Sequence, residues 1–107
     1  MSGAWVDACA VDDVEAEDVI EVTLQGRALA IYRSPSDSFH ATAALCTHQQ
    51  AHLADGLVMG ELIECPKHNG RFNYVTGAAV RIPCLEALAV FPVTVRDGRV
   101  LVELPGA

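Results

Sequence analysis

Two short groups of cysteine and histidine lie close together near the middle of the chain. Cys46 and His48 form a C-x-H group, and Cys65 and His68 form a C-x-x-H group after sixteen intervening residues. Thiolates and imidazoles are the side chains that bind zinc and iron–sulfur clusters in proteins. The spacing therefore indicates a metal centre with two thiolate and two imidazole ligands, either a tetrahedral zinc or a binuclear iron–sulfur cluster.

Zinc is the less favoured of these two metal centres. The close-spaced groups of a Cys2His2 zinc site usually pair Cys with Cys and His with His, whereas each group here is mixed. A domain of this size and apolar content also has little need of a structural zinc in order to fold. A Cys2His2 zinc-binding module remains the alternative.

The other cysteines and histidines have no partners at ligand spacing. Cys9 and Cys84 are predicted to be small buried residues that serve the structure. His52 lies near the first group but matches no ligand position, so we expect it on the surface. His40 lies within a strand pattern and is expected to face solvent or to have a hydrogen-bond partner.

Charge and hydropathy exclude several classes of partner. The chain has 107 residues, the length of one domain, and 51% of them are apolar. It carries 14 Asp and Glu against 7 Lys and Arg, a formal net charge of −7, which disfavours binding to nucleic acid and anionic lipid. No apolar run could cross a bilayer, and no secretory signal pattern is present. We therefore expect a cytoplasmic monomer with reduced thiols, no nucleic-acid partner and no membrane insertion.

The elements that must position the metal ligands have the pattern of short strands separated by turns. Alternating residues predict strands at Val19–Leu24 and Arg27–Arg33, joined by a turn at Gln25-Gly26. Asp97-Gly98, between residues 88–96 and 99–104, is the strongest hairpin signal in the chain.

Three further features complete the expected secondary structure. Additional strands are expected at residues 38–45 and 61–65, and Pro92 indicates an edge strand or a bulge. Only residues 11–19 have a pattern that allows a helical turn or two. Many short strands in a small chain predict an all-β fold, an antiparallel sandwich or barrel with the two Cys/His groups in its loops.

The sequence C-T-H, sixteen residues and then C-P-K-H-N-G closely resembles the Rieske signature C-x-H-x(15–17)-C-x-x-H. Chain length, the tryptophan near the N-terminus and the terminal hairpin also resemble stand-alone bacterial Rieske ferredoxins. The resemblance implies a single Rieske-type β-sandwich or barrel over residues 1–107, with a cluster-binding loop subdomain at about 45–85. It also implies a [2Fe–2S] cluster with Cys46 and Cys65 on one iron and His48 and His68 on the other.

The same resemblance implies a function in electron transfer rather than catalysis. Proteins of this kind are soluble one-electron carriers from a flavin-dependent NAD(P)H reductase to a terminal oxygenase, which is a ring-hydroxylating dioxygenase, a demethylase or a hydroxylase. The amino-acid sequence around the ligands most resembles that of ferredoxins of the rhizopine-catabolism type. The small Rieske-like subunit of nitrite reductase is an alternative, although those subunits generally lack the ligands.

Two finer expectations follow from the positions around the ligands. High-potential Rieske proteins resemble C-P-C-H-G-S-x-Y, whereas Gly70 and Phe72 occupy the serine and tyrosine positions here. Without these hydroxyl donors, we expect a reduction potential of about 0 mV or below. Partners are expected to make apolar contact with Leu53 and Pro83 around the two histidines.

Overall fold

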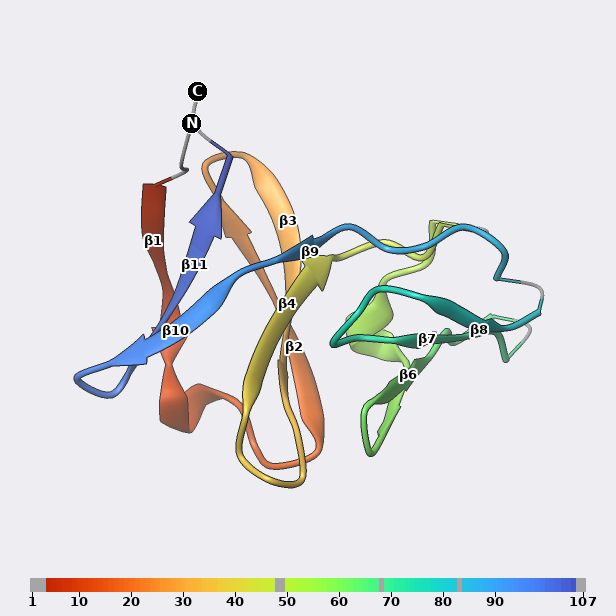
Figure 1. Cartoon of the computed structure of the whole chain (residues 1–107), viewed down its shortest axis with the longest axis horizontal. Helices are drawn as coiled ribbons and strands as arrows, with labels where there is room; N and C mark the ends of the chain where they lie inside the picture. Colours follow the sequence, from red (N-terminus) through yellow and green to blue (C-terminus); the bar gives the residue numbers. More distant parts are fainter. Residues whose placement is uncertain (1–3, 48–49, 68, 83, 106–107) are drawn as a thin grey trace.

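The computed structural model describes residues 4–47, 50–67, 69–82 and 84–105. Figure 1 shows two lobes side by side, a larger one that holds both ends of the described chain and a smaller one built from the middle of the sequence. Nearly all regular structure in the described residues is antiparallel β-sheet, which confirms the predicted all-β class. No helix in these residues is long and apolar enough to cross a membrane.

Two antiparallel sheets form the larger lobe. The first has the order β1-β11-β10 and consists of Ala4–Ala10, Arg99–Leu104 and Val93–Arg96. The second has the order β2-β3-β4-β9 and consists of Asp18–Leu24, Arg27–Arg33, Phe39–Ala43 and Val90–Phe91. The short 3-10 helix η1 (Val11–Asp13) connects β1 to β2 and accounts for the helical turn expected in this region.

Both predicted hairpins are present in the larger lobe. Arg96 pairs with Arg99, so that Asp97 and Gly98 form a two-residue turn with φ angles of 54° and 76°. Positive φ at both positions suits the right-handed twist of the strands, and glycine adopts it without steric cost. The same arrangement joins β2 to β3 across Gln25-Gly26.

Pro92 divides the strand that the sequence predicts at residues 88–96. β9 ends at Phe91 on the edge of the second sheet, and β10 begins at Val93 on the edge of the first. Proline has no N–H to donate to a sheet, so it suits the point at which the chain crosses from one sheet to the other.

A third antiparallel sheet, with the order β5-β6-β7-β8, forms the smaller lobe. Its strands are Leu57–Met59, Leu62–Glu64, Arg71–Asn73 and Ala79–Arg81, and the 3-10 helix η2 (Leu53–Asp55) precedes them. Of these four strands, each three residues long, the sequence predicts only β6, which lies within the strand expected at residues 61–65. β1 is also missed, since its many small residues and a register shift after Asp7 obscure the alternation.

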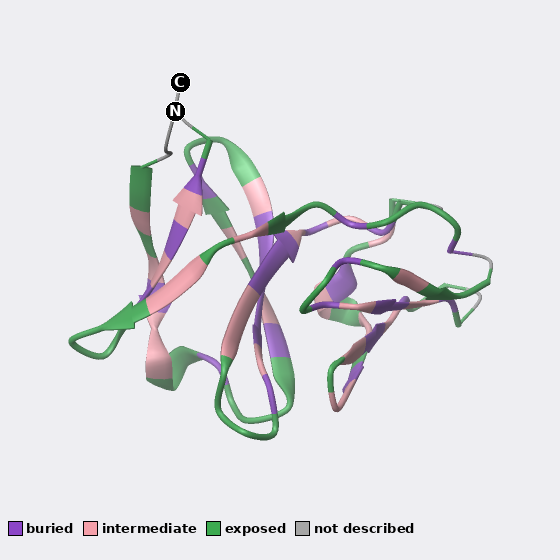
Figure 2. Ribbon diagram, in the orientation of Figure 1, coloured by how far each residue is buried: buried purple, intermediate pink, exposed green. Residues whose placement is uncertain are grey.

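Strand β3 is the centre of the fold because it is buried on both faces (Figure 2). Leu29 and Ile31 pack into the core between the two sheets of the larger lobe. Ala30 and Tyr32 pack into a second core, which the larger lobe shares with the smaller lobe. The smaller lobe is therefore packed directly against the sandwich.

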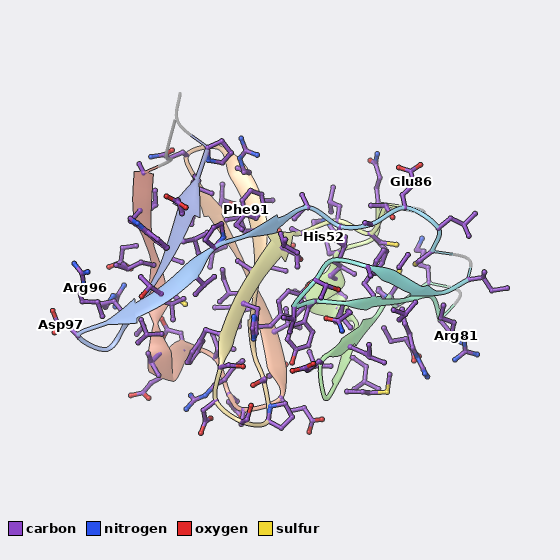
Figure 3. The ribbon with its side chains drawn as sticks, viewed as in Figure 1. His52, Arg81, Glu86, Phe91, Arg96 and Asp97 are labelled. Atoms are coloured by element: carbon purple, nitrogen blue, oxygen red, sulfur yellow. The ribbon has the colours of Figure 1, made fainter. Side chains whose placement is uncertain are left out.

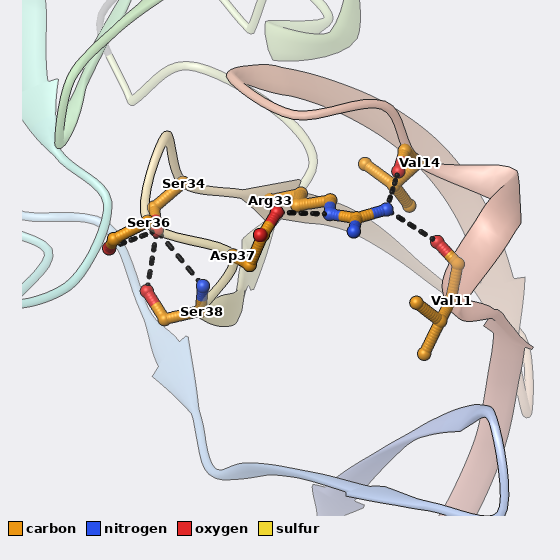
Figure 4. Close-up of polar contacts among 7 residues, drawn as sticks. All are labelled: Val11, Val14, Arg33, Ser34, Ser36, Asp37 and Ser38. Atoms are coloured by element: carbon orange, nitrogen blue, oxygen red, sulfur yellow. Dashed lines mark hydrogen bonds and ion pairs between the residues drawn. The ribbon is translucent and has the colours of Figure 1, made fainter.

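Arg33, at the end of β3, connects several turns of the larger lobe (Figure 4). Its guanidinium donates hydrogen bonds to the carbonyl oxygens of Val11 and Val14, at 3.3 and 2.9 Å, and pairs with Asp37 at 3.0 Å. These contacts hold the η1 segment against the end of the central strand.

Candidate metal centre

The two cysteines of the predicted metal centre lie in separate loops of the smaller lobe and meet there. Cys46 follows β4 and Cys65 follows β6, and each residue is only 1% exposed. Burial, followed by the neighbouring Cys46 side chain, raises the pKa of the Cys65 thiol, so the two side chains lie close together. The structure thus brings together two of the four predicted ligands, while His48 and His68 lie outside the described residues.

The first loop is closed by main-chain hydrogen bonds. The N–H of Cys46 donates to the carbonyl of Ala51, and the N–H of Gln50 donates to the carbonyl of Cys46, both at 2.8 Å. Leu45 and His52 form an isolated antiparallel bridge at the base of the loop. This local pairing fixes the direction in which the Cys46 side chain leaves the loop.

The second loop turns tightly after β6. The N–H of Cys65 donates to the carbonyl of Gly70 at 2.7 Å, and Asn69 adopts a φ of 58° within the turn. Burial raises the pKa of the Cys65 thiol, whereas the backbone N–H of Lys67 donates to the sulfur and acts in the opposite direction. An N–H aimed at sulfur stabilises the thiolate, which is the form that binds metal.

Cys84 lies at the same place, which the sequence did not predict. It is 3% exposed, as expected of a buried cysteine, but its Sγ lies 3.8 Å from the Sγ of Cys46. Burial, followed by the contact with Cys46, raises the pKa of Cys84 to about 12. Cys9, by contrast, is buried in the core of the larger lobe, as predicted.

The segment that carries Cys84 is attached to the rest of the lobe at two points. The Thr47 hydroxyl donates to the carbonyl of Glu86 at 2.8 Å, next to the first loop. The N–H of Leu88 donates to the carbonyl of Gly77 at 2.8 Å. Three segments distant in sequence therefore converge on Cys46 and Cys65, the two predicted sulfur ligands.

Exposed apolar side chains lie at the far end of the smaller lobe, but not at the residue that we predicted. Leu53 is fully buried in the core that the two lobes share, because η2 turns its side chain inward. The prediction that Leu53 contacts partners is therefore wrong, and Pro83 lies outside the described residues. Instead, Ile82 and Leu85 are 73% and 80% exposed. Figure 3 shows the residues that flank them in sequence, Arg81 and Glu86, at the end of the lobe farthest from the sandwich.

The two remaining histidines have partners away from the two predicted sulfur ligands. His52 is exposed, as predicted, and its Nδ1 lies 2.6 Å from Glu21, which raises the pKa of the imidazole. His40 is hydrogen-bonded to Ser38 at 2.9 Å, and burial lowers the pKa of its imidazole. The prediction that His40 has a partner is confirmed.

The described residues fit the thiolate half of a [2Fe–2S] centre. Two buried cysteine side chains face each other from two closed loops, and a backbone N–H donates to one of the sulfurs. Such a site supplies two side chains, shielded from water, that as thiolates can bind one iron of a cluster.

Comparison with known proteins agrees with this geometry. Residues 4–92 match the family model of the Rieske [2Fe-2S] domain. The chain is 38% identical over 104 residues to the ferredoxin component of the naphthalene 1,2-dioxygenase system of Pseudomonas putida, covering 97% of this chain and 99% of that protein. It is 42% identical over 103 residues to ferredoxin CarAc of Metapseudomonas resinovorans, covering 95% of each chain.

Solved structures also include similar ferredoxins. A ferredoxin in a complex of reduced oxygenase and oxidised ferredoxin in carbazole 1,9a-dioxygenase superposes with a TM-score of 0.88 at 39% identity, covering 96% of this chain and 95% of that one. A nitrite reductase small subunit from Mycobacterium tuberculosis also superposes, with a TM-score of 0.87, but at 22% identity it shows the fold alone. The nitrite reductase alternative is therefore less supported than the ferredoxin.

The family match also decides between the two metal centres that the ligand spacing allowed. The cofactor is a Rieske-type [2Fe–2S] cluster rather than a single zinc. The chain belongs to the Rieske [2Fe-2S] domain family and is a ferredoxin, an electron-transfer protein rather than a catalytic enzyme.

Proposed function

We propose that this ferredoxin accepts single electrons from a flavin-dependent NAD(P)H reductase and delivers them to a terminal oxygenase. The observation that carries the proposal is the meeting of two buried cysteines, Cys46 and Cys65, in the smaller lobe of a chain that matches dioxygenase ferredoxins over almost their whole length. Their names favour a ring-hydroxylating dioxygenase as the oxygenase over a demethylase or a hydroxylase. The rhizopine-catabolism subtype stays a prediction.

We also propose the complete ligand set. Cys46 and Cys65 hold one iron and His48 and His68 hold the other. The convergence of the two cysteine loops supports the first pair, and the C-x-H and C-x-x-H spacing supports the second. When bound, the cluster supplies a site that gains and loses one electron.

The exposed apolar residues at the end of the smaller lobe are the proposed docking surface for the oxygenase. Ile82 and Leu85 flank, in sequence, the buried Cys84 that contacts Cys46, so a protein seated on them lies close to the sulfur ligands. Electron carriers use small interfaces of this kind because each encounter must be brief. The complex in carbazole 1,9a-dioxygenase supports an oxygenase as the partner.

The remaining proposals concern the state of the protein in the cell. We propose a cytoplasmic monomer in which residues 1–107 form a single domain. The pairing of β11 between β1 and β10 supports the single domain, because the C-terminal strand completes the sheet that the N-terminal strand begins. The acidic charge of −7 supports a carrier that binds neither nucleic acid nor membranes.

Metal analysis of the purified protein tests the ligand assignment. We expect two iron and two acid-labile sulfide per chain, with the visible and electron paramagnetic resonance spectra of a Rieske cluster. Replacing Cys46, His48, Cys65 or His68 individually by Ala should abolish the cluster, whereas Cys9→Ser, a control in the other core, should keep it. A variant that keeps full iron content and an unchanged spectrum would remove that residue from the ligand set.

Electron transfer tests the proposed partners. The oxidised protein should be reduced by a flavin-dependent NAD(P)H reductase, and the reduced protein should be reoxidised by a ring-hydroxylating oxygenase. A protein that carries the cluster but exchanges electrons with neither class of partner would contradict the proposed function.

A further inference from the structure

Gly70 leaves a space that the thiol of Cys84 fills. A Cβ added at Gly70 would lie 2.3 Å from the Sγ of Cys84 and 3.3 Å from its Cβ. Gly70 is not among the glycines with a positive φ, so its backbone conformation is open to other residues. Glycine is needed here because the sulfur of Cys84 occupies the position of the missing side chain.

The thiol of Cys84 is directed at a sulfur that is proposed to bind iron. The Sγ atoms of Cys84 and Cys46 are 3.8 Å apart, and the two residues are 3% and 1% exposed. Both belong to one core cluster together with Phe72 and Leu88, so their surroundings are mainly apolar. The contact is therefore shielded from water. A weak hydrogen bond is stronger in such a buried environment than at the surface.

The direction of this hydrogen bond follows from the chemistry of the ligand. A cysteine bound to iron has lost its proton, so Cys46 can only accept. Cys84 lies outside the ligand motif, and a thiol buried in apolar surroundings keeps its proton. Cys84 is thus the donor whenever Cys46 holds iron.

We propose that the thiol of Cys84 donates a hydrogen bond to the sulfur of Cys46 and thereby raises the reduction potential of the cluster. The reduced cluster carries one more negative charge than the oxidised one, and a donor to a ligand sulfur stabilises that charge. Cys84 is then a residue that tunes the cluster without binding it. The inference rests on the proposed assignment of Cys46 as a ligand.

A matched pair of variants separates the hydrogen bond from packing. Cys84→Ala and Cys84→Ser remove the same sulfur atom and differ by one hydroxyl, so only the serine variant keeps a donor. Measured by protein-film voltammetry, Cys84→Ala should have a lower midpoint potential than the wild type, and Cys84→Ser a higher one than Cys84→Ala. We expect a roughly threefold change in the ratio of reduced to oxidised cluster for the alanine variant, equal to about 28 mV for a one-electron couple.

Resonance Raman spectra give a second readout that a purely structural role would not change. Exchange of the thiol proton for deuterium should shift an iron–sulfur stretching band in the wild type, and Cys84→Ala should show a smaller shift. Equal potentials for the alanine and serine variants, in protein that carries its cluster, would overturn this inference alone. Loss of iron from both variants would also overturn it, because Cys84 would then be needed to hold the cluster. A wild type without iron would overturn the ligand assignment as well.

Discussion

Tyr32 and Tyr74 stack face to face between the two lobes, with ring centroids 4.5 Å apart and an angle of 3° between the ring planes. Tyr32 lies on β3 of the sandwich, Tyr74 follows β7 of the smaller lobe, and both are fully buried. Each hydroxyl has a partner: Tyr32 is hydrogen-bonded to Thr42 at 2.9 Å, and Tyr74 donates to the carbonyl of Gly60. The pair is therefore a direct contact that holds the smaller lobe on the sandwich.

The stacked pair should contribute measurably to stability. We expect Tyr32→Leu and Tyr74→Leu each to lower the free energy of unfolding by about 2–4 kcal/mol, because each leaves a cavity and an unpaired hydrogen-bond partner. A double-mutant cycle should give a coupling of about 1 kcal/mol between the two rings. Urea denaturation of the holoprotein measures these values, with Trp5→Leu at an exposed position as the control. Strict additivity of the two substitutions would show that the rings do not stabilise each other.

A side chain at position 70 should disturb the second cysteine loop. Gly70→Ser places a Cβ 2.3 Å from the Sγ of Cys84, so we expect partial loss of iron and a lower melting temperature. The combined variant Gly70→Ser with Cys84→Ala removes that sulfur and should recover iron content. Iron analysis and thermal unfolding measure both effects. A single variant as stable and as fully loaded as the wild type would contradict the close approach of these two residues.

The proposed docking surface predicts an effect on partner binding without an effect on the cluster. Ile82→Asp and Leu85→Asp should each weaken productive docking with the oxygenase about tenfold, as expected for exposed apolar contacts at the centre of an interface. Val95→Asp is the matched control, since Val95 is an exposed apolar residue on β10 of the larger lobe. Oxygenase kinetics at increasing ferredoxin concentration measure docking, and the visible spectrum checks the cluster.

Two outcomes would place docking elsewhere on the molecule. The first is that both substitutions in the smaller lobe are tolerated, and the second is that the control has the larger effect. Leu53→Asp cannot serve in this series, because Leu53 is fully buried and a charge there would destabilise the fold.

The ion pair between His52 and Glu21 predicts a pH-dependent contribution to stability. Glu21 raises the pKa of His52 above its ordinary value of 6.5, so the pair stabilises the folded state fully below that pH. The contribution is lost as the pH rises through the raised pKa, where His52 loses its charge. The melting temperature of Glu21→Gln should therefore fall further below that of the wild type at about pH 6 than at about pH 9. The same difference at both pH values would show that the charge of the pair does not contribute.

The sequence alone was sufficient to predict the features that depend on neighbouring residues. The turn at Asp97-Gly98 was predictable because a two-residue hairpin requires positive φ at positions close in sequence. The C-x-H and C-x-x-H groups indicated a metal centre because their ligand side chains are also close in sequence, and this spacing restricts which metal centres the loops can bind. The class of fold followed from the many short alternating segments.

Tertiary structure decided which distant residues meet at the site. Cys84 lies 38 residues after Cys46, and nothing in the spacing of the chain indicates that their sulfurs touch. Their contact depends on the missing side chain of Gly70 and on how the segment after β8 packs over the two loops. Leu53 was wrongly predicted to be exposed for a related reason. The sequence does not tell whether an apolar loop residue contacts a partner protein or packs into the core, and the packing of η2 turns Leu53 inward. Local sequence determines turns and ligand spacing, whereas burial and long-range contacts emerge only when the sheets pack together.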